Sequence, residues 1–259
     1  MRRLSTVILM LAASVAMAAG PNAPERDVQA SNLSDQRAID LINEMEELYR
    51  GEASVARLTM SIETPQYSRT LRMEAKSMGV ENSLIRILEP RKDRGIATLK
   101  LDKEMWNYFP KINKVIKVPP SMMMGSWMGS DFTNDDLVQQ TTLTQAYRLA
   151  LNETAAQYRV ILHPKEQTIT VWGKIDYVID KDTMIPVEQN FYDDDGTMIR
   201  RLEFKQPKQF DGVLLPSVLE MTPLNKQGHK TVITYESLLF DTSDVSPDDF
   251  TLRNLQSRF

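Results

Sequence analysis

The clearest local pattern in the sequence is one amphipathic helix near the start of the chain. Apolar residues recur at helical spacing between positions 38 and 49, and charged or polar residues occupy the opposite face. Ser34 is suited to cap the N-terminus of this helix, and Gly51 stands where helices commonly end. The pattern predicts a helix that lies with one face on an apolar surface, and its apolar stripe is Ala38, Leu41, Ile42, Met45, Leu48 and Tyr49.

Beyond this helix, apolar and polar residues alternate with a period of two, which is typical of β-strands. Turn dipeptides such as Asp102-Lys103, Asp195-Gly196 and Asp211-Gly212 separate many of the alternating runs. The runs that predict strands are 58–63, 70–76, 83–88, 96–101, 105–109, 112–118, 147–152, 158–162, 168–180, 186–192, 197–204, 213–222 and 231–240.

Consecutive strands without helices between them predict one antiparallel, strongly curved sheet of about 11 strands. The expected fold class is therefore α+β, mainly antiparallel β, with the N-terminal helix and short helices covering the sheet. A short helix is expected to begin near Asn134, with Leu137 and Val138 facing inward, and a last turn is expected at 246–250. Three nearby carboxylates are interpreted as charges at the N-terminus of the short helix, and they are Asp131, Asp135 and Asp136.

Residues 119–132 do not fit either pattern. Four methionines, Trp127 and Phe132 stand there among glycine, serine and proline, although large apolar side chains are normally buried in regular elements. Because methionine is flexible and polarizable, such a cluster can repack around partners of varying shape. We interpret the segment as a soft apolar surface for a lipid-like ligand.

The candidate ligand contacts are Met122, Met123, Met124, Trp127, Met128, Phe132, Trp106 and Tyr108. Filling of the core is the alternative interpretation for the aromatic members, and it is the favoured one for Trp106 and Trp172.

The N-terminus has the pattern of a cleavable signal peptide over residues 1–18. Arg2 and Arg3 form a basic region, residues 6–15 are apolar, and Ala16-Met17-Ala18 supplies a small-x-small cleavage site. The apolar run is shorter than the about 20 residues that a membrane span needs, so an uncleaved anchor is the less favoured alternative. Residues 19–34 are polar and are expected to form a flexible leader to a single domain at 35–259.

The composition limits the classes of function. The chain has no cysteine, which excludes disulfides, thiol catalysis and lipidation of an N-terminal cysteine. The net charge of −4 becomes −6 when Arg2 and Arg3 leave with the signal, a balance that argues against nucleic-acid binding.

Signals for catalysis or metal binding are weak. His163 and His229 belong to no ligand pattern, and the serine in Gly125-Ser126-Trp127-Met128-Gly129 is displaced from the centre of a nucleophile elbow. Asp193-Asp194-Asp195-Gly196 lacks the spacing of a calcium loop and is interpreted as a hairpin turn. We predict no catalytic residue, no metal and no cofactor.

Two basic segments flank the central strands, namely residues 91–94 and the group Lys111, Lys114 and Lys117. A solvated rim is the favoured interpretation, and contact with anionic lipid head groups or an acidic partner is the alternative.

Several motifs resemble the LolA-like outer-membrane lipoprotein-sorting proteins of Gram-negative bacteria. The most specific is K-V-P-P-S-M-M-M-G-S-W-M-G-S-D-F-T-N-D-D-L, with W-N-Y-F-P-K-I-N-K just before it. The others are L-I-R-I-L-E-P-R-K-D-R-G-I-A-T-L-K, V-W-G-K-I, Y-D-D-D-G, G-H-K-T-V-I and F-T-L-R-N-L, so the resemblance spans nearly the whole mature chain. The chain looks like the longer LolA-like branch rather than the shorter LolA carrier itself.

The resemblance implies an open half-barrel sheet with an apolar cavity for acyl chains, and a protein that works in the periplasm without enzymatic activity. The partners it implies are the acyl chains of lipoproteins or lipids, an inner-membrane transporter and an outer-membrane acceptor; a monomer is expected. The leading hypothesis is a carrier between the inner and outer membranes. The alternatives are an accessory subunit that docks on an inner-membrane (RND-type) transporter without cargo, and a lipid hydrolase, for which no nucleophile–base pair is visible.

Overall fold

The structure, a computed structural model, describes residues 35–49, 51–139 and 143–257. The predicted signal peptide and flexible leader, residues 1–34, lie outside the described residues. Within the described part of the chain, no helix is long and apolar enough to cross a bilayer.

The described residues contain 13 strands in one sheet, slightly more than the about 11 expected from antiparallel alternation. The first group is β1 (Ala53–Glu63), β2 (Ser68–Met78), β3 (Asn82–Glu89), β4 (Ala97–Leu101), β5 (Glu104–Phe109) and β6 (Lys114–Lys117). The second group is β7 (Tyr147–Glu153), β8 (Gln157–Pro164), β9 (Lys174–Asp180), β10 (Pro186–Tyr192), β11 (Met198–Phe210), β12 (Val213–Pro223) and β13 (Lys230–Phe240).

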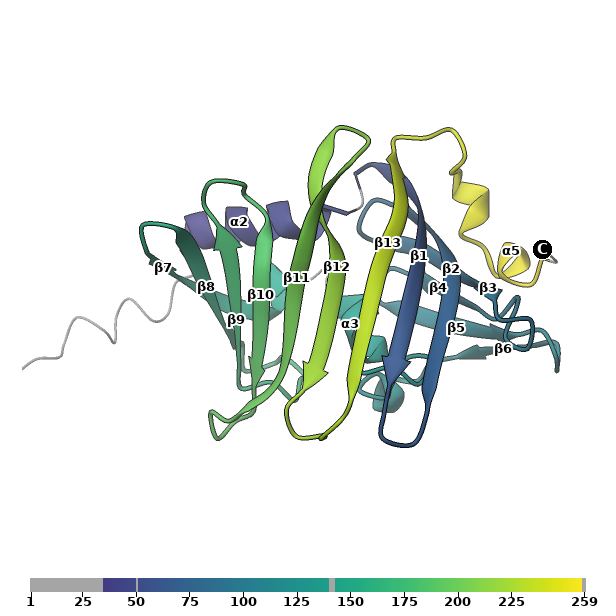
Figure 1. Cartoon of the computed structure of the whole chain (residues 1–259), viewed down its shortest axis with the longest axis horizontal. Coiled ribbons are helices and arrows are strands. Elements are labelled where there is room, and N and C mark those ends of the chain that lie inside the picture. Colours follow the sequence, from purple (N-terminus) through teal and green to yellow (C-terminus); the bar gives the residue numbers. More distant parts are fainter. Residues whose placement is uncertain (1–34, 50, 140–142, 258–259) are drawn as a thin grey trace, which may run out of the picture. The chain divides into compact units, whose positions relative to one another are not determined.

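The strand order shows how the chain builds an open sheet. It is β6-β5-β4-β3-β2-β1-β13-β12-β11-β10-β9-β8-β7, with every neighbouring pair antiparallel (Figure 1). The first and last strands meet in the middle, from Ser54 opposite Phe240 to Glu63 opposite Lys230. The two edges, β6 and β7, are therefore joined by the longest connection between strands, residues 118–146.

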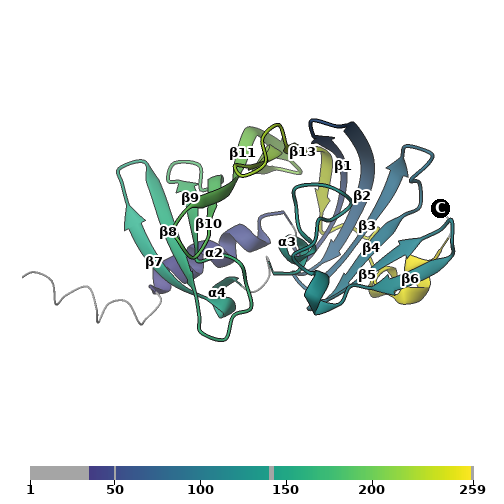
Figure 2. The same cartoon turned by 90° about the horizontal axis from the view of Figure 1, so that it is seen from below.

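The helices lie mainly on the inner side of the curved sheet. Figure 2 shows α2, α3 and α4 within the arch of strands, as an open half-barrel covered by helices requires. The helical elements are α2 (Gln36–Glu47), the 3₁₀ turn η1 (Pro120–Met122), α3 (Asn134–Gln139), α4 (Leu143–Ala146), the 3₁₀ turn η2 (Pro247–Asp249) and α5 (Leu252–Leu255).

Helix α2 confirms the predicted amphipathic pattern. Its buried residues, Ala38, Leu41, Ile42 and Met45, pack in one cluster with side chains from β7 to β12. The cap is Asp35, whose carboxylate accepts a hydrogen bond from the Arg37 N–H at 2.8 Å. Ser34, the predicted cap, lies outside the described residues.

The outer side of the sheet is also covered at one end, where the C-terminal segment packs on β3, β4 and β5. Val245, Phe250 and Leu255 form a cluster with Leu99 and other buried residues of these strands. Arg86 fixes this segment, because its guanidinium donates to the carbonyl oxygen of Asn254 at 3.0 Å. Strand β4 is consequently buried on both faces.

One strand prediction was too long. The expected strand at 168–180 begins only at Lys174, and residues 165–173 form a loop instead. At the end of this loop the backbone of Gly173 lies close to that of Asp193, since a Cβ at position 173 would lie 2.5 Å from the carbonyl oxygen of Asp193. Helices α4 and α5 were not predicted, because four residues are too few to show a helical period.

Candidate functional site

The methionine-rich segment folds over the inner face of the sheet, and we call residues 118–139 the lid. Within it the backbone N–H of Trp127 donates to the backbone carbonyl of Phe132 at 2.8 Å, and Gly129 adopts a φ of +80° at the turn between these two residues. A positive φ is strained for residues with a Cβ, so glycine is suited to this position. Both aromatic side chains are buried, Trp127 at 4% exposed and Phe132 at 7%.

Trp127 joins the lid to the sheet through a buried polar chain. Its indole N–H donates to Thr98 Oγ1 at 3.1 Å, and the Thr98 hydroxyl donates to Asn107 Oδ1 at 2.7 Å. A buried indole usually needs such an acceptor. The contact therefore positions Trp127 against β4 and β5.

A cavity of about 210 Å³ lies between the lid, α2 and the inner face of the sheet. Its walls are mainly apolar, and Trp127 and Phe132 are part of them. The apolar lining is Met45, Ala56, Leu58, Met73, Ala75, Ile85, Trp127, Phe132, Leu137, Leu143, Phe204, Leu219 and Ile233. Polar side chains also line it, namely Glu46, Tyr49, Ser54, Lys76, Ser77, Ser83, Asp136, Tyr177, Gln189 and Tyr235.

Two phenol groups of the cavity, those of Tyr177 and Tyr49, are neutral over a wide pH range. Burial is the main cause that raises the pKa of Tyr177 and of Tyr49 well above the ordinary value for tyrosine. Because desolvation opposes the phenolate, these two side chains add no charge to the wall.

A buried ion pair ties helix α3 of the lid to strand β11. Arg200 is 3% exposed, and its Nη1 donates to Asp136 Oδ2 at 2.8 Å while Nη2 donates to Asp136 Oδ1. The guanidinium also lies 4.1 Å from the ring centroid of Phe191 and 4.5 Å from that of Trp172. This bidentate pair holds the lid against the sheet.

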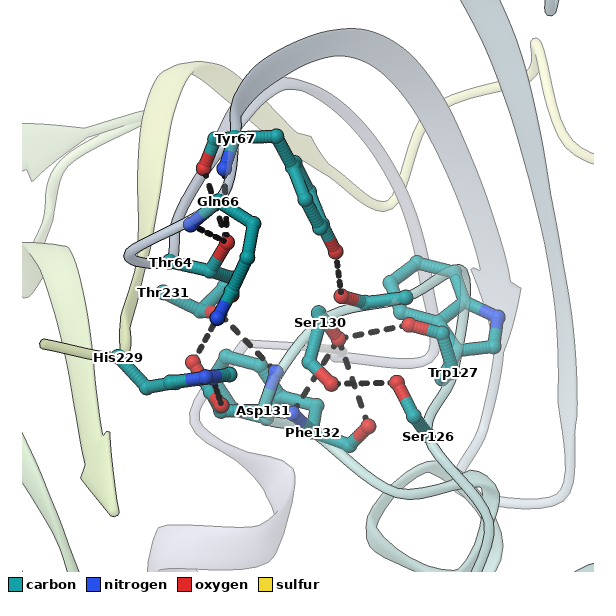
Figure 3. Close-up of polar contacts among 11 residues, drawn as sticks. Thr64, Gln66, Tyr67, Ser126, Trp127, Ser130, Asp131, Phe132, His229 and Thr231 are labelled. Carbon is teal, nitrogen blue, oxygen red and sulfur yellow. Dashed lines mark hydrogen bonds and ion pairs between the residues drawn. The ribbon is translucent and has the colours of Figure 1, made fainter. Parts of the chain in front are cut away.

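Residues of two hairpins, β1–β2 and β12–β13, hold the loop of the lid, as Figure 3 shows. From the β1–β2 turn, the Tyr67 hydroxyl donates to the carbonyl oxygen of Gly129 at 3.2 Å. From the other side, the Thr231 hydroxyl donates to Asp131 Oδ2 at 2.8 Å, and His229 Nδ1 lies 3.5 Å from Asp131 Oδ1. Asp131 therefore anchors the loop, whereas the sequence pattern favours a place for it among the charges at the N-terminus of α3.

The predicted ligand contacts do not all lie at one site. Trp127 and Phe132 line the cavity, and Met124 and Met128 pack half-buried against the clusters around it. Met122 is 62% exposed. Met123 lines a different groove, beside Pro120.

Trp106 and Tyr108 lie elsewhere. Both belong to the cluster on the outer side of the sheet, where the C-terminal segment packs. The structure thus places these two away from the cavity, in agreement with the core interpretation that was favoured for Trp106.

The ion pair of Arg200 and Asp136 was not identified from the sequence. A signal was present, because the period of two puts Arg200 on the same face as the buried Leu202. The partner, Asp136, is 64 positions away in the sequence, so no local pattern predicts the pair.

The described residues contain no group of three or more His, Asp or Glu side chains placed to hold a metal ion. The Ser126 hydroxyl donates to the carbonyl oxygen of Ser130 (Figure 3). The Asp193 carboxylate accepts the N–H groups of Asp195 and Thr197, as expected for a hairpin turn.

Three solved structures share this architecture. A protein assigned as an outer membrane lipoprotein-sorting protein domain from Vibrio parahaemolyticus is 22% identical, with a TM-score of 0.73 over 86% of this chain and 99% of its own. A DUF1329 family protein from Desulfovibrio piger is 22% identical, with a TM-score of 0.74 over 86% and 100%. A LolA superfamily protein from Nitrosomonas europaea is 17% identical, with a TM-score of 0.68 over 84% and 98%.

These likenesses establish the LolA-like fold, and they confirm the resemblance carried by the sequence motifs. A family model described as an uncharacterized protein matches residues 79–257, which is more than half of the chain. The chain belongs to this uncharacterized family, and its fold is LolA-like. No curated protein sequence matches it.

Proposed function

We propose that this protein is a non-enzymatic carrier that shields the acyl chains of lipoproteins or other lipids on their way through the periplasm. The observation that carries the proposal is the mainly apolar cavity of about 210 Å³, lined in part by a lid that polar contacts hold in place. A core designed only for stability would be packed without such a space.

The cavity is small for an acyl chain. An apolar cavity of about 150 Å³ binds a benzene molecule, and pockets for larger ligands span about 300–1,000 Å³. The space of about 210 Å³ therefore accepts a small part of an acyl chain. Entry of a full chain requires movement of the lid, with Trp127 as the side chain that gives way.

The energetics fit a shuttle. Each buried CH₂ contributes about 0.8 kcal/mol, so a 16-carbon chain left in water costs on the order of 12 kcal/mol. Opening of the lid breaks the Arg200–Asp136 pair and the contacts of Trp127 and Asp131 with the sheet. These contacts are few, so the gain from burying an acyl chain is sufficient to offset their loss, and their re-formation favours release.

The compartment and partners follow from the same proposal. The signal peptide pattern of residues 1–18 implies export, and relatives in fold include a protein assigned to outer membrane lipoprotein sorting. Loading from an inner-membrane transporter and delivery to an outer-membrane acceptor, by a monomer, complete the proposed cycle. A docking subunit without cargo is not favoured, because it has no use for an internal apolar cavity.

A titration with a fluorescent fatty acid tests the proposal. Ala75 lines the cavity, so Ala75→Phe fills part of the space and is expected to weaken binding about tenfold or more. Ala150, exposed on edge strand β7, provides the matched control Ala150→Phe, which leaves binding unchanged. Absence of binding by the unaltered protein would refute the carrier function.

A further inference from the structure

The loop between β8 and β9 is held firmly against the protein. The Thr168 hydroxyl donates to the carbonyl oxygen of Ala146 at 2.5 Å, and Thr170 Oγ1 lies 3.1 Å from the Tyr147 hydroxyl. Trp172 is buried, and its N–H donates to Thr170 Oγ1 at 3.2 Å. Thr168, Thr170 and Trp172 thus face the protein.

The odd-numbered positions between them present apolar side chains to solvent. Ile169 is 92% exposed and Val171 is 49% exposed. Single exposed apolar residues are common, but two β-branched side chains on one anchored loop form a small projecting apolar surface. Ile169 and Val171 are exposed because the residues that alternate with them are held against the protein.

A groove of about 1,060 Å³ adjoins this loop and reaches the lid. Ile169 of the loop and Met123 and Pro120 of the lid line it together. Met122, in the same turn as Pro120, is 62% exposed. Apolar side chains from two separate segments therefore flank one groove.

The groove is more basic than the chain as a whole. Four of its lining residues are cationic, namely Lys103, Lys117, Arg148 and Lys165, and three are acidic, namely Glu104, Asp135 and Glu166. The full chain, in contrast, has a net charge of −4. Cations beside projecting apolar side chains complement a surface of anionic head groups over an apolar interior.

We propose that Ile169, Val171 and Met122 form a landing surface for an anionic phospholipid bilayer. These apolar side chains enter the head-group region while Lys103 and Arg148, which line the groove, contact phosphates. The inference rests on the proposed carrier function, because a carrier of acyl chains must meet a membrane to exchange them. The groove then leads from the bilayer to the lid.

A bilayer fits this surface better than a protein partner does. Stable protein interfaces bury about 800 Å² on each partner, far more than three side chains provide. Shallow insertion of a few apolar groups, in contrast, gives weak and reversible membrane binding. Reversible landing is what repeated exchange requires.

Co-sedimentation with vesicles tests the landing surface. The protein purified after export is mixed with vesicles of phosphatidylethanolamine and phosphatidylglycerol in a ratio of about 3:1, a composition chosen for its negative surface potential. The double variant Ile169→Asp/Val171→Asp is expected to lower the partition coefficient about tenfold or more. The matched control Val213→Asp changes an exposed β-branched residue that does not line the groove, and it leaves partitioning unchanged.

Binding of a fluorescent fatty acid, measured without vesicles, separates this inference from the carrier function. Fatty-acid binding that persists in the double variant, together with lost vesicle binding, supports the landing surface. An unaltered protein that binds fatty acid but no vesicles overturns the landing surface and leaves the carrier function standing. Equal vesicle binding by the unaltered protein and the double variant, or binding only to vesicles that contain membrane proteins, also overturns it.

Discussion

Substitution of Asp136 by asparagine tests whether the buried ion pair holds the lid. The carboxylate lies at the first turn of α3, accepts two N–H groups of Arg200 and lines the cavity. Asparagine keeps the size of the side chain but removes the charge. Arg200, 3% exposed, then remains as a cation without its anionic partner.

The magnitude follows from the burial of the pair. Removal of one partner from a buried ion pair costs about 3–5 kcal/mol. In a domain of about 150–250 residues, 1 kcal/mol lowers Tm by about 2–4 °C, so the expected loss is about 6–20 °C. The exposed pair of Lys117 and Glu104, both 52% exposed, offers a control, because Glu104→Gln costs less than about 1 kcal/mol.

Thermal unfolding, followed by circular dichroism, measures the decrease in Tm. Fatty-acid uptake measures how readily the lid opens. The double variant Asp136→Asn/Arg200→Met is expected to recover stability, because the introduced methionine side chain would pack on Phe191 and Trp172 without a buried charge. Asp136→Asn is also expected to speed fatty-acid uptake. A decrease in Tm no larger than that of Glu104→Gln would refute the claim that this ion pair holds the lid.

Three further predictions concern the cavity and the sheet. Trp127→Ala is expected to lower the free energy of unfolding by about 3–5 kcal/mol while fatty-acid affinity rises, and weaker binding would show that Trp127 is a ligand contact instead of a plug. The pKa values of Tyr177 and Tyr49 are raised in the folded state, so above the ordinary tyrosine pKa of about 10 these phenols lose protons first in the unfolded chain. The free energy of unfolding should therefore fall as pH rises beyond about 10. Tyr177→Phe should reduce this fall, and an unchanged dependence of stability on pH would contradict the prediction. Gly173→Ala would place a Cβ 2.5 Å from the carbonyl oxygen of Asp193, and urea unfolding should show a loss of about 1–3 kcal/mol; a neutral effect would mean that the backbone moves freely there.

Local periodicity was sufficient to predict most of the fold. The stripe of α2 and the alternation of the strands survive in the structure because each element buries one face. The first turn of α3 at Asn134 and the turn at Pro247 were also predicted, since both depend on nearby residues alone. The extent of β9 was wrong because the alternation of Ile169 and Val171 belongs to an anchored loop.

The site itself could be predicted only in part. Composition identified the lid, but it could not show which of its large side chains turn inward, and Met122 and Trp127 have opposite environments. Alternation also could not distinguish the two faces of β5, because the C-terminal segment covers the outer one. The partner of Arg200 depends on tertiary packing between distant segments.

Native mass spectrometry of the protein purified from its native source tests the central claim most directly. The carrier account predicts a population whose added mass corresponds to one bound acylated molecule, which organic extraction removes and which the Ala75→Phe variant loses. Purification in an entirely unliganded form, together with failure to take up any acyl lipid on incubation, would contradict the account.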